Sequence, residues 1–171
     1  GAEFTIIAAA GETPDYGLPG VNGTPRRHHQ IEFKTLNSSF TASRRLHQQV
    51  RSSTWSTRGW TYQEVLLSSR RVYFTDWEII FECQTLCARE MVSDDLGSAT
   101  LAYLPICPWL KSDQSFDEIY QRLCEYHRLN LTYSEDTIRA VEGVIHSFPF
   151  TCNTSWPFGA SEGQHTIIHF Y

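Results

Sequence analysis

The sequence of 171 residues lacks the features that mark several classes of protein. No apolar run approaches the roughly 20 residues that a membrane-spanning helix requires, so we predict no membrane span. Its five cysteines include no Cys-x-x-Cys pair, and their odd number argues against a disulfide framework and against a zinc ribbon. We therefore expect no disulfide and no bound metal, and a cytoplasmic location.

No secretory signal peptide and no Met open the sequence, which begins with Gly1. This beginning indicates a fragment of a longer protein. One observation favours secretion instead, because all four asparagines head an Asn-x-Ser/Thr sequon. They are Asn22, Asn37, Asn130 and Asn153. Cytoplasmic location remains our prediction.

The net charge of −5 is unevenly distributed. Residues 1–75 carry nine basic and five acidic side chains, whereas residues 76–171 carry five basic and fourteen acidic ones. The arginines of the basic half occur as scattered pairs, and no nucleic-acid-binding motif surrounds them. We predict that the two halves attract each other and that the chain binds no nucleic acid.

With 41% hydrophobic residues, the sequence is that of a folded domain. Its patterns predict a mixed α/β (α+β) fold of short strands and a β-hairpin packed with amphipathic helices. The apolar run 5–10 predicts a strand buried on both faces. The runs 30–33 and 39–42 predict two further strands, and 44–52 has the composition of a helix.

The next segment predicts a helix followed by a hairpin. Thr57 can cap a helix that ends at Ser68, and the β-rich runs 70–75 and 77–83 can pair through a tight turn. Glu78 and Glu82 alternate with apolar neighbours in the second run. We therefore expect these two carboxylates on a solvated face of the sheet.

Residues 90–115 are rich in turn formers and predict a loop. Ser115 and Glu118 form a capping box, which predicts a helix with an apolar stripe at Phe116, Ile119, Tyr120, Leu123 and His127. A second helix is predicted from Thr132 to Phe148, with Ile138, Val141 and Ile145 in its stripe. The pattern of residues 166–171 predicts a last strand.

The stretch Trp55–Glu64 is the densest candidate site. Trp60 and Glu64 share a helix face at i and i+4, with Arg58 and Gln63 nearby. A carboxylate held against an indole is desolvated, which raises its pKa and suits acid–base work or recognition of a ribose hydroxyl. The alternative is structural, with Trp60 in the core and Glu64 paired to Arg58.

The glycines from Gly11 to Gly20 invite comparison with phosphate-binding loops. Their spacing matches neither the dinucleotide-binding nor the Walker pattern, and no Lys-Ser/Thr follows. They are better explained by turns with positive φ.

These stretches, in their order, resemble a known family. Residues 2–11, 17–21 and 55–64, followed by 66–71 and 81–83, look like the C-terminal part of the fungal heterokaryon incompatibility (HET) domain. Residues 126–133, with Asp136 and the helix to Phe148, are similar to the region that follows this domain. The resemblance places the C-terminal part of a HET domain at 1–88 and a downstream segment with two amphipathic helices at 89–171.

The resemblance implies a module for non-self recognition that triggers cell death through contacts with a protein partner, and it leaves an oligomer open. A remote likeness of the family to TIR domains implies a flavodoxin-type core. It also gives an alternative function, an NAD glycohydrolase with Glu64 as key carboxylate. NAD is the cofactor under that alternative only.

For the candidate site, Glu64 and Arg58 are the candidate catalytic residues, and Trp60, Gln63 and Trp55 are candidate binding residues. We expect Arg58 and Glu64 within salt-bridge reach near the start of a helix, with Trp60 largely buried.

Overall fold

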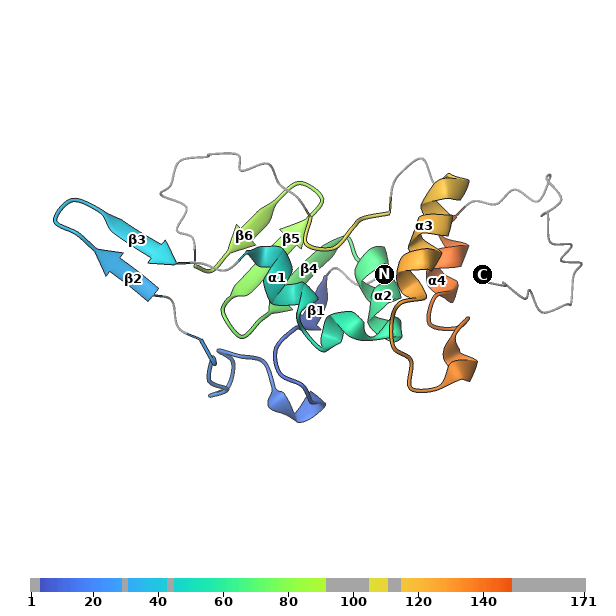
Figure 1. Ribbon diagram of the computed structural model, residues 1–171, viewed down its shortest axis with the longest axis horizontal. Helices are drawn as coiled ribbons and strands as arrows, with labels where there is room; N and C mark the ends of the chain where they lie inside the picture. Colours follow the sequence, from blue (N-terminus) through green and yellow to red (C-terminus); the bar gives the residue numbers. More distant parts are fainter. Residues whose placement is uncertain (1–3, 29–30, 43–44, 92–104, 111–114, 149–171) are drawn as a thin grey trace, which may run out of the picture.

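The computed structural model describes residues 4–28, 31–42, 45–91, 105–110 and 115–148. Four strands form one sheet in the order β1-β4-β5-β6 (Figure 1). They are β1 (Thr5–Ala8), β4 (Arg70–Phe74), β5 (Ile79–Cys83) and β6 (Cys87–Arg89). β1 runs parallel to β4, and the other pairs are antiparallel. The mixed α/β fold and the hairpin of β4 and β5 are confirmed, whereas β6 was not predicted.

The helices are short. They are the 3-10 helix η1 (Pro14–Tyr16), α1 (Leu46–Arg51), the 3-10 helix η2 (Trp55–Thr57), α2 (Gly59–Leu67), α3 (Phe116–Tyr126), the 3-10 helix η3 (Ser134–Asp136) and α4 (Glu142–His146). Among them, α1 and α2 lie in the crossover that joins the parallel strands β1 and β4. None of the helices in the described ranges is long and apolar enough to cross a membrane.

One cluster of buried side chains holds these elements together. Ile7, Tyr73 and Ile80 contribute from one face of the sheet, which we call the inner face. The helices add Val50 from α1, Val65 and Leu66 from α2, and further residues from α3 and α4: Ile119, Tyr126 and Val144. Residues on both sides of position 88 therefore share one core.

The strand predicted at 5–10 ends earlier and is buried less than expected. β1 ends at Ala8, and Ile6 is 54% exposed, so the prediction of burial on both faces is wrong. The reason is its position, because β1 is an edge strand of this sheet. The turn role of the following glycines is confirmed, since Gly11 and Gly17 have φ of 72° and 79°.

A second, separate sheet is the antiparallel hairpin of β2 (Ile31–Lys34) and β3 (Ser39–Ala42); the sequence predicts the two strands but not their pairing. Figure 1 shows it extending away from the four-stranded sheet. The hydroxyl of Thr35 at its turn donates a hydrogen bond to the carbonyl oxygen of Ser38 at 3.1 Å.

The predicted Ser115 cap of α3 is confirmed, because the Ser115 hydroxyl accepts a hydrogen bond from the backbone N–H of Glu118 at 3.3 Å. The predicted apolar stripe is partly wrong. Ile119 is buried, but Phe116 and Tyr120 are exposed. Glu118 and Arg122 are buried instead, joined by an ion pair of 2.8 Å, so the pair satisfies its own charges within the core.

The helix predicted from Thr132 to Phe148 is interrupted. η3 and α4 are separated by turns, and Ile138 is exposed. The Tyr126 hydroxyl donates to the carbonyl oxygen of Thr137 at 2.7 Å, and the N–H of Val141 bonds to Ile138 three residues back rather than to Thr137. A tertiary contact thus takes the place of a helical hydrogen bond. The strand predicted at 166–171 lies outside the described residues.

Candidate functional site

The candidate stretch Trp55–Glu64 folds as a 3-10 turn followed by α2. The predicted Thr57 cap is wrong, because Thr57 ends η2 and Arg58 is the N-cap residue, with no side-chain capping bond. The Thr61 hydroxyl does not replace this cap, because it donates to carbonyl oxygens and thereby ties the preceding 3-10 turn to the helix. It lies 2.9 Å from the carbonyl oxygen of Trp55 and 2.7 Å from that of Arg58.

Gly59 brings the start of α2 against the chain at residues 130–131. Its N–H donates to the carbonyl oxygen of Asn130 at 2.8 Å, and the N–H of Asn130 donates to Thr57 at 2.7 Å. A Cβ atom at position 59 would lie 2.6 Å from Leu131 Cδ2. A side chain at position 59 would therefore have to displace the end of the Leu131 side chain.

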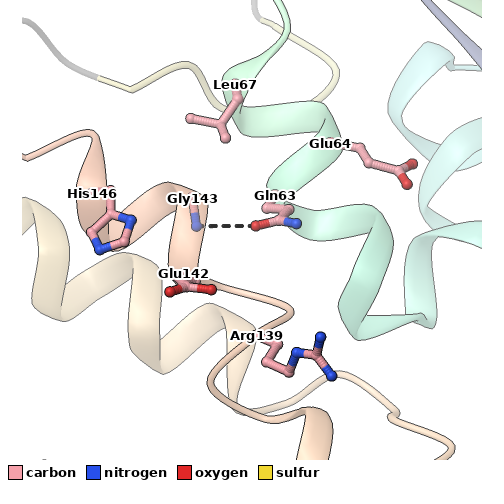
Figure 2. Close-up of a pocket in the computed structure, with 7 residues that line it drawn as sticks. All are labelled: Gln63, Glu64, Leu67, Arg139, Glu142, Gly143 and His146. Atoms are coloured by element: carbon pink, nitrogen blue, oxygen red, sulfur yellow. Dashed lines mark hydrogen bonds between the residues drawn. The ribbon is translucent and has the colours of Figure 1, made fainter.

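Tyr62 and Gln63 bind the two downstream helices. The Tyr62 hydroxyl lies 2.7 Å from a carboxylate oxygen of Glu125 and 3.0 Å from the carbonyl oxygen of Arg122, both on α3. Gln63 Oε1 accepts a hydrogen bond from the N–H of Gly143 on α4 at 3.2 Å (Figure 2). Gln63, a predicted binding residue, thus serves the packing of α2 against α4.

Glu64 lines an open groove of about 490 Å³ between α2 and α4. Its side chain is exposed and points away from Gly143 and His146 (Figure 2). No ion pair joins it to Arg58 in the part of the chain that the structure describes, so the predicted pair is wrong. Exposure leaves this carboxylate without the desolvation that the enzyme hypothesis needs.

The two tryptophans also differ from expectation. Trp60 is 37% exposed, so its predicted burial is wrong. Trp55 packs against the core, with its ring edge toward Tyr73 at 6.4 Å between centroids. The core-facing positions of α2 belong to Thr61, Val65 and Leu66, which leaves Trp60 on the opposite side of the helix.

The acidic residues predicted on a solvated strand face are instead buried on the inner face. Glu78 and Glu82 are both fully buried, so that prediction is wrong. Their charges are satisfied by neighbouring strands: Glu82 pairs with Arg71 of β4 at 3.2 Å, and Glu78 pairs with Arg89 of β6. Sequence alternation alone could not reveal these partners, because they come from other strands.

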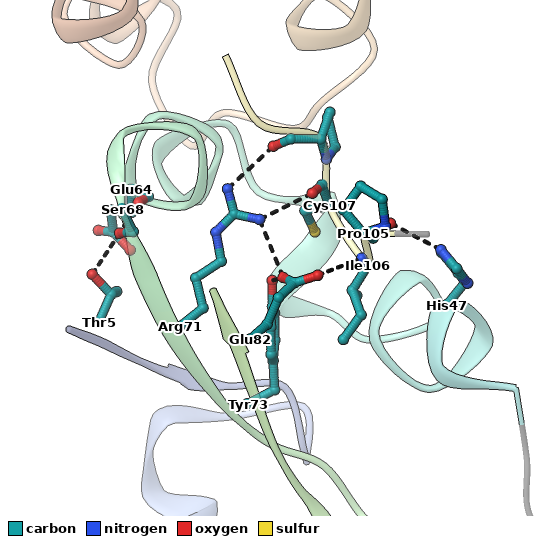
Figure 3. Close-up of polar contacts among 11 residues, drawn as sticks. Thr5, His47, Glu64, Ser68, Arg71, Tyr73, Glu82, Pro105, Ile106 and Cys107 are labelled. Atoms are coloured by element: carbon teal, nitrogen blue, oxygen red, sulfur yellow. Dashed lines mark hydrogen bonds and ion pairs between the residues drawn. The ribbon is translucent and has the colours of Figure 1, made fainter. Parts of the chain in front are cut away.

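The Arg71–Glu82 pair also holds residues 105–110 onto the sheet (Figure 3). Glu82 accepts hydrogen bonds from the Tyr73 hydroxyl at 2.9 Å and from the N–H of Ile106 at 2.7 Å. The Arg71 guanidinium donates to the carbonyl oxygens of Cys107 and Pro108 at 3.0 and 3.1 Å. This cluster is a structural centre rather than a ligand site.

Burial raises the pKa values of the Tyr62 and Tyr73 hydroxyls above the usual tyrosine value near 10. Above pH 10 these hydroxyls ionise in the unfolded chain but stay protonated in the folded one. Their stabilisation is therefore complete below pH 10 and is lost as the pH rises further. We expect the free energy of unfolding, measured by urea denaturation, to fall as the pH rises above 10. In Tyr62→Phe it should fall less steeply with pH. An unchanged slope would contradict this origin.

The opposite face of the sheet is apolar, and we call it the outer sheet face. Cross-strand register places its side chains in rows, because paired residues point to the same side. Its members are Ile6, Ala8, Val72, Phe74, Ile79, Phe81, Cys83 and Ala88. Arg70 lies at one corner, in the row of Cys83.

None of these eight residues belongs to the core cluster of the described chain or packs against it. Ile6, Ala8 and Ala88 are exposed, and the other five are half-buried. The described helices α1 and α2 contribute their buried residues to the inner face only, so they do not cover this one. Sequence reasoning missed the outer sheet face because it placed Glu78 and Glu82, rather than the apolar residues that alternate with them, on the solvated side of this strand.

A smaller polar cleft of about 170 Å³ lies at the carboxyl ends of β1 and β4. Some of its polar groups already have partners. Asp76 accepts a hydrogen bond from the Tyr16 hydroxyl at 2.9 Å and lies 3.8 Å from Arg27, and His28 stacks on Trp77. Across the described ranges, no group of three or more potential ligand residues is placed to hold a metal ion. Within the same ranges, Cys83, Cys87, Cys107 and Cys124 form no disulfide.

Comparison with known proteins adds one finding. Residues 1–64 match the family model described as heterokaryon incompatibility protein (HET), and the match includes the whole candidate stretch Trp55–Glu64. No curated protein and no solved structure matches the chain. The chain therefore carries a HET domain, matched at residues 1–64, and the resemblance of its sequence to this family is confirmed.

Proposed function

We propose that this chain is an allorecognition module of fungal heterokaryon incompatibility, linked to programmed cell death and acting through protein contacts in the cytoplasm. The observation that carries the proposal is the outer sheet face. This mixed sheet has one parallel and two antiparallel strand pairs, and an antiparallel sheet that faces water on one side normally carries polar side chains there. Here the face that the described helices leave open is apolar.

The continuity of the outer sheet face, rather than its size, supports a contact role. Strands lie about 4.8 Å apart and rise about 3.3 Å per residue, so four strands of four residues span roughly 19 by 13 Å. This area lies within the range of apolar patches on ordinary soluble proteins, but its apolar side chains run without interruption across all four strands. A protein partner would remove this surface from water, at a gain of about 25 cal/mol per Å² buried.

Two finer parts of the proposal concern organisation. We infer that residues 1–88 are the C-terminal part of the HET domain and that 89–171 form the segment downstream of it. The parallel β1–β4 pair with its helical crossover is compatible with part of a TIR-like, flavodoxin-type core. These inferences rest on the resemblance and on strand topology.

The proposal is tested by viability of fungal cells that express the chain. Ile6→Lys places a charge on the outer sheet face at an exposed position of an edge strand, so the fold should tolerate it. We expect this variant to lose the killing activity, and Glu64→Gln to retain it. Killing that survives Ile6→Lys but is lost in Glu64→Gln would contradict the contact function.

No observation favours the alternative, NAD cleavage by Glu64. The groove beside Glu64 is open and its carboxylate is exposed, so the residues around it do not fit a site that would enclose a dinucleotide. We expect the purified chain to release no nicotinamide from NAD, measured by chromatography. Release that disappears in Glu64→Gln would reverse the order of the two functions.

A further inference from the structure

We propose that the peptide bond between Asn22 and Gly23 is a site of spontaneous deamidation, which converts Asn22 to aspartate or isoaspartate in the folded chain. This modification site goes beyond the proposed function and does not involve the outer sheet face. The first observation lies in the sequence, where Asn22 is the one asparagine that precedes a glycine. The other three, Asn37, Asn130 and Asn153, are followed by serine, leucine and threonine.

The reaction needs only water and a base from the solvent. The backbone nitrogen of Gly23 loses its proton and attacks Cγ of Asn22, which forms the N–Cγ bond of a cyclic succinimide. The Cγ–Nδ2 bond breaks, and the side-chain nitrogen takes up a proton and leaves as ammonia. Water then opens the ring. Cleavage of the N–Cγ bond gives aspartate, and cleavage of the bond from nitrogen to the backbone carbonyl carbon gives isoaspartate, so each product adds one negative charge.

The structure leaves the two reacting groups accessible. Asn22 and Gly23 are the central residues of an exposed turn, with φ of 48° and 81°, and the N–H of Thr24 donates to the carbonyl oxygen of Val21 at 2.9 Å. Positive φ at both central positions defines a type I′ turn. Within the described ranges, the N–H of Gly23 donates no hydrogen bond, and no atom beyond its chain neighbours lies within 4 Å of where its Cβ would be. The attacking nitrogen is therefore not shielded by a hydrogen bond or by a packed side chain.

One exposed hydrogen bond resists the reaction. The peptide group after Asn22 must rotate to bring the nitrogen of Gly23 onto Cγ, which breaks the bond from Thr24 to Val21. The net contribution of such a bond slows the reaction by at most about tenfold relative to the unfolded chain. Asn22 is also the only non-glycine residue of the described ranges with positive φ, an unfavourable conformation that the rotation can relieve.

Two other asparagines serve as comparisons within the same chain. Asn37 lies in the connection between β2 and β3 and is exposed like Asn22, but Ser38 follows it, and its side chain crowds the attacking nitrogen. The backbone at Asn130 is held on both sides. Its N–H donates to Thr57 at 2.7 Å, and its carbonyl oxygen accepts from Gly59 at 2.8 Å, so folding should suppress deamidation there.

The test is peptide mapping of the full chain by mass spectrometry after incubation in mildly alkaline buffer, with and without guanidinium chloride. We expect Asn22 to be converted before Asn37 and Asn130 in the folded chain. Its rate there should lie at most about tenfold below its rate in denaturant. Methylation of the same peptide by an isoaspartyl methyltransferase identifies isoaspartate, and circular dichroism checks that the chain without denaturant stays folded.

Two variants locate the reaction. Asn22→Gly removes the side-chain amide but suits the same turn, so the modification should be absent from this peptide. Gly23→Ala adds a methyl group where no atom lies within 4 Å, so it hinders the attack on Cγ without a clash. This variant should lose most of the modification at Asn22 and keep the rate at Asn37 unchanged.

Earlier conversion of Asn37 or Asn130 in the folded chain would overturn the proposal. A folded rate at Asn22 more than about tenfold below the rate in denaturant would do the same, since the turn would then protect its own amide. Unchanged modification in Gly23→Ala would reject the role of the open glycine nitrogen. None of these results bears on the contact function, which Ile6→Lys tests separately.

Discussion

Replacing Glu82 with alanine is expected to lower the free energy of unfolding by about 3–5 kcal/mol, since it leaves the buried Arg71 charge without its partner. Both side chains are completely buried and lie 3.2 Å apart. The change also removes the acceptor for the Tyr73 hydroxyl and for the N–H of Ile106. Residues 105–110 should detach from the sheet before the rest unfolds.

Urea denaturation measures the loss, with Glu32→Ala as the control. Glu32 forms an exposed pair with Lys34, and exposed pairs contribute only about 0–1 kcal/mol. The double variant Arg71→Met/Glu82→Leu should recover much of the stability, because it removes both buried charges together. Equal effects of Glu82→Ala and Glu32→Ala would show that the buried pair does not hold this region.

Replacing Gly59 with valine should destabilise the chain by about 1–3 kcal/mol, the usual cost of overpacking. A Cβ at this position would lie 2.6 Å from Leu131 Cδ2 and 3.4 Å from Tyr126 Cε2. The added side chain would therefore push residues 130–131 away from α2. It would also strain the two backbone hydrogen bonds made through Asn130.

Chemical denaturation measures this loss, and limited proteolysis shows whether α3 and α4 become more accessible. Glu64→Val is the matched control, because it adds the same β-branched residue to α2 at an exposed position. Its cost should be that of helix propensity, below about 1 kcal/mol. Similar losses in the two variants would contradict this steric effect.

Local signals in the sequence predicted the elements well. The Ser115 cap fixes the start of α3, and the alternation in residues 70–83 predicts the β4–β5 hairpin. These features depend on residues close in sequence, so the sequence alone contains them. The same holds for the turn glycines after β1, whose positive φ follows from local geometry.

The candidate site was harder to predict because its side chains bind partners that are far away in the sequence. Gln63 binds Gly143 on α4, 80 positions away, and Tyr62 binds α3. Once these contacts fix the rotation of α2, Trp60 and Glu64 are left facing solvent. Tyr62 and Gln63 thus take part in internal packing, whereas a site role for the exposed residues Arg58, Trp60 and Glu64 stays a prediction.

The two faces of the sheet show the same limit of sequence analysis. Polar residues of a strand are normally assigned to solvent and apolar ones to the core. Here Arg71 and Glu82 neutralise each other inside, so the apolar row with Val72 and Phe81 faces outward. Ion pairing between strands cannot be read from either strand alone.

The most direct test of the central claim, that the outer sheet face is a protein-contact surface, is hydroxyl-radical footprinting by mass spectrometry. Labelling of the purified chain is compared with labelling of the chain recovered in complex from cells it kills. We expect Ile6 and Phe81 to be protected in the complex, while Trp60 and Leu67 on the exposed side of α2 are labelled equally in both states. Protection of Trp60 and Leu67, with Ile6 and Phe81 labelled as in the free chain, would contradict the account.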